Sequence, residues 1–253
     1  MMLCWRQLSF SYEALPVLNN ITADVQRGEL LGVIGANGAG KSSLLQLTAG
    51  VIPMQHGAVE LFGRSADKLS VSERAKRVSY LPQIAAVEWP LNVRQVVALG
   101  RLPHSGMFLQ ESDDDVVAIT EAMLNTDVIA LAERRMTTLS GGERMRVMIA
   151  RMLATQAELL LADEPIAALD LLHQLQIMQL FKQHCERGGA AVIALHDLNM
   201  AARFCDRLLL LHNHQMLVSG TPTQVLTSDH LSQAYGVTVA INEHAGRLCV
   251  HPL

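Results

Sequence analysis

Hydrophobic residues in the first third of the chain follow strand patterns. Between residues 21 and 25 every second residue is apolar, which indicates a strand buried on one face. Residues 30–34 form a continuous apolar run, as expected of a strand that is buried on both faces. A helix is predicted over residues 41–49, with Gly50 at its end. Two further short strands are expected at residues 59–62 and 78–81.

The middle of the chain shows helical patterns instead. Helices are predicted over residues 93–99, 113–124 and 142–154. The second begins with three aspartates, and negative charge in a first turn complements the helix dipole. In the third, apolar residues recur at the spacing of a buried helical stripe: Met145, Met148, Ile149, Met152 and Leu153.

Strands and helices alternate in the last part of the chain. Strands are expected at 159–162, 190–194 and 208–211, and helices at 169–184 and 197–204. This alternation predicts a mostly parallel sheet covered on both faces, with the helical middle inserted into it. Two more short helices are expected, one capped by Thr221 and one over residues 228–235.

The composition narrows the class of protein. Twenty Lys and Arg against 24 Asp and Glu give a net charge of −4, so we expect no nucleic-acid partner. Only 17% of the residues are charged, against about 25% in typical soluble domains, which favours a surface partly covered by a partner. The four cysteines are scattered, so no disulfide framework is expected. The first ten residues include Arg6, so no signal peptide is expected there. No apolar run reaches the length of about 18 residues that spans a membrane.

A phosphate-binding motif follows the strand at residues 30–34. The sequence Gly35-Ala36-Asn37-Gly38-Ala39-Gly40-Lys41-Ser42 fits G-x-x-x-x-G-K-[ST], between a strand and a helix as this P-loop motif requires. Glycines allow backbone N–H groups to turn toward phosphates, and the helix start adds a partial positive charge. Lys41 is expected to reach the β- and γ-phosphates and Ser42 to hold Mg²⁺. The predicted ATP-binding residues of this segment are Gly35, Asn37, Gly38, Ala39, Gly40, Lys41, Ser42 and Ser43.

Two acids end the apolar strand at residues 159–162. Mg²⁺ beside a P-loop needs a carboxylate opposite the phosphates, and Asp163 is the candidate. Glu164 is the next residue, so its side chain points in a different direction from that of Asp163. It is predicted to hold the attacking water as a general base.

Two glycines also begin the third helix of the middle region. With Ser140 they form Leu139-Ser140-Gly141-Gly142-Glu143, a second potential anion site. Here the chain resembles the ATP-binding cassette (ABC) ATPases, whose signature is L-S-G-G. Three other segments match that family in order along nearly the whole chain: residues 80–83 resemble the Q-loop, 167–170 the D-loop and 194–197 the switch-histidine segment.

The resemblance implies an α/β fold: a P-loop NTPase core with a mostly parallel sheet, an antiparallel β region and an inserted helical subdomain. The expected division is a core of residues 1–84 and 157–220, a helical subdomain of residues 85–156 and a C-terminal extension of residues 221–253, all in one cassette.

The resemblance also implies that two copies enclose two ATP molecules. Ser140, Gly141 and Gly142 would then serve the partner's nucleotide, and Asp170 of the D-loop is also counted among the ATP-binding residues. Gln83 would contact Mg²⁺ and the water, and His196 the γ-phosphate. Tyr12 falls where the family stacks an aromatic ring on adenine; the alternative is a packed edge-strand residue. One departure is Ala167, where the D-loop commonly has Ser.

Segments that are less specific than the ATP motifs indicate one branch of the family. Residues 99–104 resemble the G-R-x-P-[HW] segment of importers of iron-siderophores, heme and cobalamin, and segments after His196 and around Thr221 also resemble that branch. The implied protein is a peripheral ATPase subunit at the cytoplasmic face of the inner membrane. It would bind a multi-span permease, which a periplasmic binding protein supplies with the chelate. A DNA-repair ATPase would carry long heptad arms and a translation-factor ATPase two cassettes, and these remain the alternatives.

Two other features have competing interpretations. His212-Asn213-His214 could bind a metal, but a hairpin turn with Asn213 in the left-handed region is favoured. Trp89 either lines the groove for the membrane subunit or packs in a local core.

Overall fold

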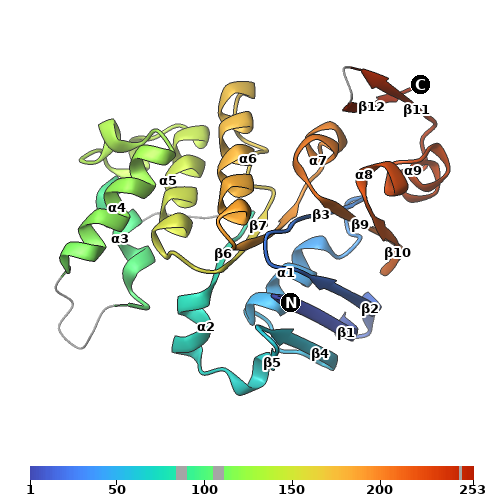
Figure 1. The fold of residues 1–253 in the computed structure, drawn as a ribbon, viewed down its shortest axis with the longest axis horizontal. Helices are drawn as coiled ribbons and strands as arrows, with labels where there is room; N and C mark the ends of the chain where they lie inside the picture. The colour runs from blue at the N-terminus through green and yellow to red at the C-terminus, as the bar shows by residue number, and fades with distance from the viewer. Residues whose placement is uncertain (84–89, 105–110, 245–246) are drawn as a thin grey trace.

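The computed structural model describes residues 1–83, 90–104, 111–244 and 247–253 (Figure 1). Trp89 lies outside these residues. Six strands form the central sheet, in the spatial order β10 (Gln215–Gly220), β9 (Arg207–His212), β3 (Leu30–Gly35), β8 (Ala190–Ala194), β7 (Leu159–Asp163) and β6 (Val78–Leu81). All neighbours are parallel except β9 and β10. The predicted mostly parallel sheet is therefore confirmed.

Side chains of the central sheet divide between two hydrophobic cores. In β3, Leu30 and Ile34 join the large core, which contains most of the helices. Leu31 and Val33 join a second core, shared with α1 (Lys41–Ala49). Because successive side chains of a strand face opposite sides, an apolar residue is needed at every position. All six residues of β3 are buried, as the continuous apolar run predicts.

A second sheet, at the lower right of Figure 1, covers the α1 side. Its antiparallel strands lie in the order β2 (Leu15–Val25), β1 (Leu3–Tyr12), β4 (His56–Leu61) and β5 (Arg64–Ser65). The interpretation of Tyr12 as an edge-strand residue is wrong, because β1 pairs with β2 on one side and β4 on the other. After β5 come a short 3₁₀ helix (Ala66–Lys68) and α2 (Val71–Arg77).

The inserted helical region lies at the left of Figure 1. It contains α3 (Val93–Ala98), α4 (Asp113–Asn125) and α5 (Gly141–Ala154), with 3₁₀ turns at Leu99–Arg101, Ile129–Leu131 and Met136–Thr138. The three predicted helices are confirmed to within one residue at each end. The stripe on α5 is buried or half-buried against the large core, which explains its apolar spacing.

The segment that carries the branch resemblance packs inside this helical region. Arg101 and Asp115 form a buried ion pair, with Nε of Arg101 2.6 Å from Oδ1 of Asp115. A Cβ on Gly100 would lie 2.3 Å from the Arg151 carbonyl oxygen, so only glycine permits this close approach to α5. A ring nitrogen of His104 lies 2.9 Å from the Thr155 carbonyl oxygen. These residues hold the helices together at the end of α5.

The remaining elements are α6 (Leu171–Glu186), α7 (Leu198–Phe204), α8 (Pro222–Val225), α9 (Ser228–Tyr235) and the hairpin of β11 (Val239–His244) and β12 (Arg247–Pro252). The last hairpin has no counterpart in the sequence prediction. Helix α6 starts two residues later than predicted because the Asp170 side chain caps it, accepting from the His173 N–H.

The histidine pair lies in a hairpin turn. Strands β9 and β10 pair directly on either side of Asn213 and His214, whose φ angles are 47° and 67°. The turn interpretation is confirmed. Among the described residues no cluster of His, Cys, Asp and Glu could hold a metal ion. Nor does any helix in that part of the chain have the length and apolarity to cross a membrane.

Candidate functional site

Three glycines shape the loop between β3 and α1. Gly35, Gly38 and Gly40 have φ angles of 148°, 77° and 103°, all in the region that side chains disfavour. A Cβ on Gly35 would lie 2.4 Å from the Leu211 carbonyl oxygen, and one on Gly40 would lie 2.7 Å from the Val17 carbonyl oxygen. The glycines of the motif are therefore required by the loop conformation and by its neighbours.

Lys41 begins α1 and turns back over this loop. Its side chain is buried, and Nζ donates to the carbonyl oxygens of Gly35 at 2.8 Å and Ala36 at 3.2 Å. Burial lowers the pKa of Lys41, while the carboxylates of Glu164 and Asp163 act in the opposite direction. An ammonium group held by carbonyls beside two acids is placed to bind a phosphate.

Asp163 ends β7 and is only 2% exposed. Its Oδ1 atom is buried and has no hydrogen-bond partner among the described residues. Burial raises the pKa of Asp163, and the Ser42 side chain acts in the opposite direction. A buried, unpartnered carboxylate oxygen next to a serine hydroxyl fits the oxygen ligand set of Mg²⁺.

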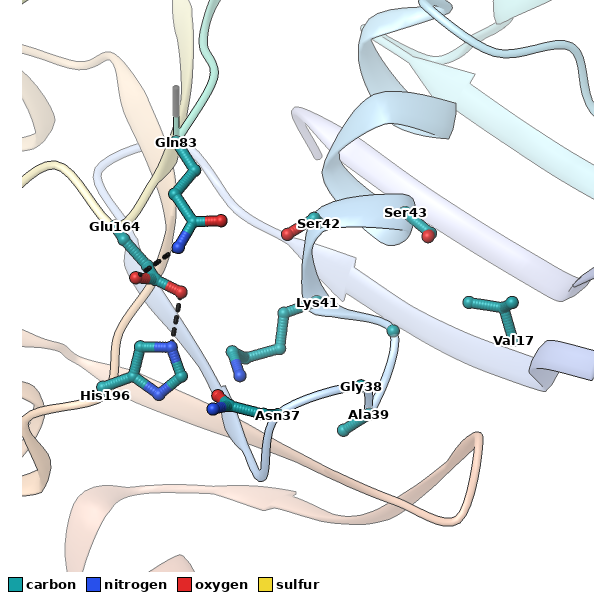
Figure 2. Close-up of a pocket in the computed structure, with 11 residues that line it drawn as sticks. Val17, Asn37, Gly38, Ala39, Lys41, Ser42, Ser43, Gln83, Glu164 and His196 are labelled. Atoms are coloured by element: carbon teal, nitrogen blue, oxygen red, sulfur yellow. Dashed lines mark hydrogen bonds and ion pairs between the residues drawn. The ribbon is translucent and has the colours of Figure 1, made fainter. Parts of the chain in front are cut away.

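Glu164 follows in the left-handed backbone region, with φ of 53°. Its carboxylate accepts from Gln83 Nε2 at 2.8 Å through one oxygen and pairs with His196 Nε2 through the other (Figure 2). Gln83 lies just after β6, Glu164 after β7 and His196 after β8. Since these three strands are parallel neighbours, their carboxyl ends bring the three side chains together.

These groups line a cavity of about 660 Å³, shown in Figure 2. Ten of the predicted site residues line it: Asn37, Gly38, Ala39, Gly40, Lys41, Ser42, Ser43, Gln83, Glu164 and His196. Gly35 and Asp163 adjoin the lining residues, because Gly35 accepts a hydrogen bond from Lys41 and Asp163 directly precedes Glu164. Val17 of β2 also lines the cavity. Sequence reasoning missed Val17, because nothing distinguishes it locally from any other apolar strand residue.

Besides Gly35 and Asp163, five predicted residues do not line this cavity. Ser140 caps α5 in a reciprocal arrangement: its N–H donates to Glu143 Oε2 at 2.7 Å and its Oγ accepts from the Glu143 N–H at 3.2 Å. Gly141 and Gly142 form the first turn of the same helix. Asp170 caps α6, and its Oδ1 lies 2.8 Å from Nδ1 of His173.

Tyr12 is the fifth of these residues. The residue is 48% exposed, and its ring stands edge-on to Phe10, with 4.8 Å between the ring centroids. Its role on adenine stays a prediction.

The sequence profile of the ABC transporter family matches residues 18–167 of this chain. The chain belongs to the ABC transporter family. It is an ABC-type ATPase, and the resemblance found in its motifs is confirmed.

A curated relative is 42% identical over 239 residues. It is the hemin import ATP-binding protein HmuV of Thermobifida fusca, and the alignment covers 94% of this ATPase and 84% of the relative. Among solved structures, an ABC transporter described as of metal-chelate type, in an inward-facing conformation, has a TM-score of 0.84 at 27% identity and covers 100% of this chain and 97% of that one. A dimeric ATP-binding cassette bound to ADP and phosphate has a TM-score of 0.78 at 25% identity, with 87% of this chain and 99% of that one covered.

Proposed function

We propose that this ATPase is the ATP-hydrolysing subunit of an importer for a metal chelate, working as a dimer on a separate membrane permease at the cytoplasmic face of the inner membrane. The observation that carries the proposal is the 42% identity to a hemin import subunit over 94% of the chain. The substrate would be a heme-like chelate, delivered to the permease by a binding protein. Cobalamin and iron-siderophores are the other chelates of the same branch.

In this proposal the cavity holds ATP. Backbone N–H groups of the loop after Gly35 and the Lys41 ammonium bind its phosphates, and the start of α1 adds its dipole. Mg²⁺ would be held by Ser42, Asp163 and Gln83, and when bound it neutralises charge on the phosphate oxygens. Support for this set comes from the unpartnered Oδ1 of Asp163.

Glu164 would act as the general base. A water held by its carboxylate would lose a proton to it during attack on the γ-phosphate, and His196 and Gln83 orient that carboxylate. Gln83 follows β6 and His196 follows β8, the two neighbours of β7, so the two contacts hold the Glu164 carboxylate from both sides.

A second copy would complete the site. Ser140, Gly141, Gly142 and Asp170 lie away from the cavity of their own chain, which is consistent with a role toward a partner's nucleotide. Hydrolysis by the isolated ATPase should then rise faster than linearly with its concentration while the dimer is forming. Strictly linear activity, with no dimer detected by size exclusion in ATP, would contradict the shared site.

The importer function is tested by reconstitution. The ATPase is co-purified with its permease, placed in liposomes, and assayed for ATP-dependent uptake of heme, cobalamin or a ferric siderophore in the presence of the binding protein. We expect uptake of one of these chelates with the native chain and none with Glu164→Gln. Failure to associate with any multi-span membrane protein would instead favour the DNA-repair or translation-factor alternatives.

A further inference from the structure

The C-terminal part of the chain reaches the phosphate-binding loop. The hydroxyl oxygen of Tyr235, the last residue of α9, accepts a hydrogen bond from the Gly35 N–H at 2.9 Å. The two residues are 200 positions apart in the sequence. Gly35 is the first glycine of the loop, so a helix outside the central sheet touches the start of the proposed ATP site.

Gly35 connects this contact to Lys41. Its N–H is bound by Tyr235, and its carbonyl oxygen accepts from Lys41 Nζ at 2.8 Å. On a third side, the Leu211 carbonyl oxygen lies 2.4 Å from the position that a Cβ of Gly35 would take. The position of the Gly35 peptide therefore depends on the Tyr235 hydroxyl, and the direction of the Lys41 side chain depends on Gly35.

Helix α9 is itself held firmly. Leu231 and Ala234 are buried in the large core. After the helix, the hairpin β11–β12 is fastened to α7 by the Asn199 amide, which accepts from the Val250 N–H at 2.8 Å and donates to its carbonyl oxygen at 3.3 Å. A helix anchored on both sides can fix the position of a loop, whereas a loosely attached one could not.

The hydroxyl of Tyr235 keeps its proton throughout the physiological range. Burial raises its pKa to about 12. The contact with Gly35 is thus a neutral hydrogen bond that does not change with pH near 7.

We propose that Tyr235 is a positioning residue for ATP binding: its hydroxyl holds the Gly35 peptide, and through it the loop and Lys41, in the geometry that receives the phosphates. This inference rests on the proposed ATP site. It makes the C-terminal segment part of the nucleotide-binding machinery, although none of the residues described in that segment lines the cavity of Figure 2.

Removal of the hydroxyl should lower the population of the binding-competent loop. Tyr235→Phe keeps the ring and its packing but leaves the Gly35 N–H without its acceptor. When only a fraction of the molecules is competent, the apparent dissociation constant rises by the reciprocal of that fraction. We expect MgATP to bind about 3- to 10-fold more weakly, with kcat within about twofold of the native value, because ground state and transition state lose the same contact.

Ser228→Ala provides a matched control. It removes one hydroxyl from the same helix, where Ser228 Oγ donates to the Val239 carbonyl oxygen at 3.1 Å, away from the loop. The dissociation constant of MgATP, kcat and Tm are measured for both variants and the native chain. Weaker binding only in Tyr235→Phe, with kcat retained, supports the positioning role.

Three results would overturn it. An unchanged dissociation constant in Tyr235→Phe would make the contact purely structural, and equal weakening in Ser228→Ala would trace the effect to general destabilisation.

If Tyr235→Phe does not fold, amide exchange of Gly35 is measured by NMR in the native chain: slow exchange supports the contact, and exchange as fast as in an open loop rejects it. If the native chain itself does not bind MgATP, the proposed function fails as well.

Discussion

The strongest test of the proposed chemistry is Glu164→Gln. In the native structure the Glu164 carboxylate accepts from Gln83 and pairs with His196. A glutamine amide can keep both contacts, since its oxygen can accept from Gln83 and its NH₂ can donate to a neutral His196 ring. The substitution therefore removes the negative charge and the basicity while leaving the arrangement of the three side chains in place.

The expected cost falls on catalysis rather than on folding. A positioned general base contributes about 10²- to 10⁴-fold, so kcat should fall by that factor, equivalent to about 2.7–5.4 kcal/mol in the activation barrier. The backbone at residue 164 stays in the left-handed region, and glutamine is no more strained there than glutamate. Because Glu164 also repels Asp163, its neutralisation should leave the Tm unchanged or slightly higher.

The assay compares single-turnover phosphate release, the dissociation constant of ATP and the elution volume in ATP. Glu60→Gln is the matched control, because Glu60 is on β4 and its exposed partner is Arg6. We expect slow phosphate release, retained ATP binding and a trapped dimer in Glu164→Gln only. Phosphate release within about threefold of the native rate would refute the general-base assignment and the energy derived from it.

Three further predictions use other parts of the structure. Burial raises the pKa of Asp163, so its charge destabilises the folded chain in full above that raised pKa. The penalty decreases as pH falls from the raised pKa toward the ordinary value and is absent below it. Without nucleotide, Asp163→Asn should raise stability at pH 7 by about 1 kcal/mol while abolishing hydrolysis, as thermal melts from pH 4 to 8 would record. The hydrogen bond from Arg101, supported by Ser112, lowers the pKa of Asp115 to about 2, so the stability from this ion pair is present above the ordinary pKa and is lost as pH falls toward 2. Asp115→Asn should therefore lower the free energy of unfolding at pH 7 by about 3 kcal/mol, measured with denaturant. A loss below about 1 kcal/mol would show that the pair is dispensable. Tyr12→Ala should weaken ATP binding about 5- to 150-fold, while Tyr12→Phe should retain it. An unchanged dissociation constant for ATP with a lower Tm in Tyr12→Ala would show that Tyr12 only packs on Phe10.

Local sequence determined most elements and the position of the loop motif. Helix α1 has the predicted bounds, because a glycine on each side ends its regular backbone and the apolar run before it can only be a doubly buried strand. The pairing of a buried carboxylate with the P-loop was also predictable, since both follow apolar strands that end at the same edge of a parallel sheet. The assignment to the ABC family followed from motif order and was confirmed.

Only the tertiary structure decided which side chains meet. Glu164 contacts Gln83 from 81 positions away and His196 from 32, and Tyr235 reaches Gly35 from 200. Such contacts depend on the order of strands in the sheet and on the packing of the C-terminal helices, which local patterns do not specify. For the same reason Val17 and the β11–β12 hairpin escaped prediction, and the edge-strand interpretation of Tyr12 was wrong: hydrophobic periodicity says which face of an element is buried, but not which neighbour buries it.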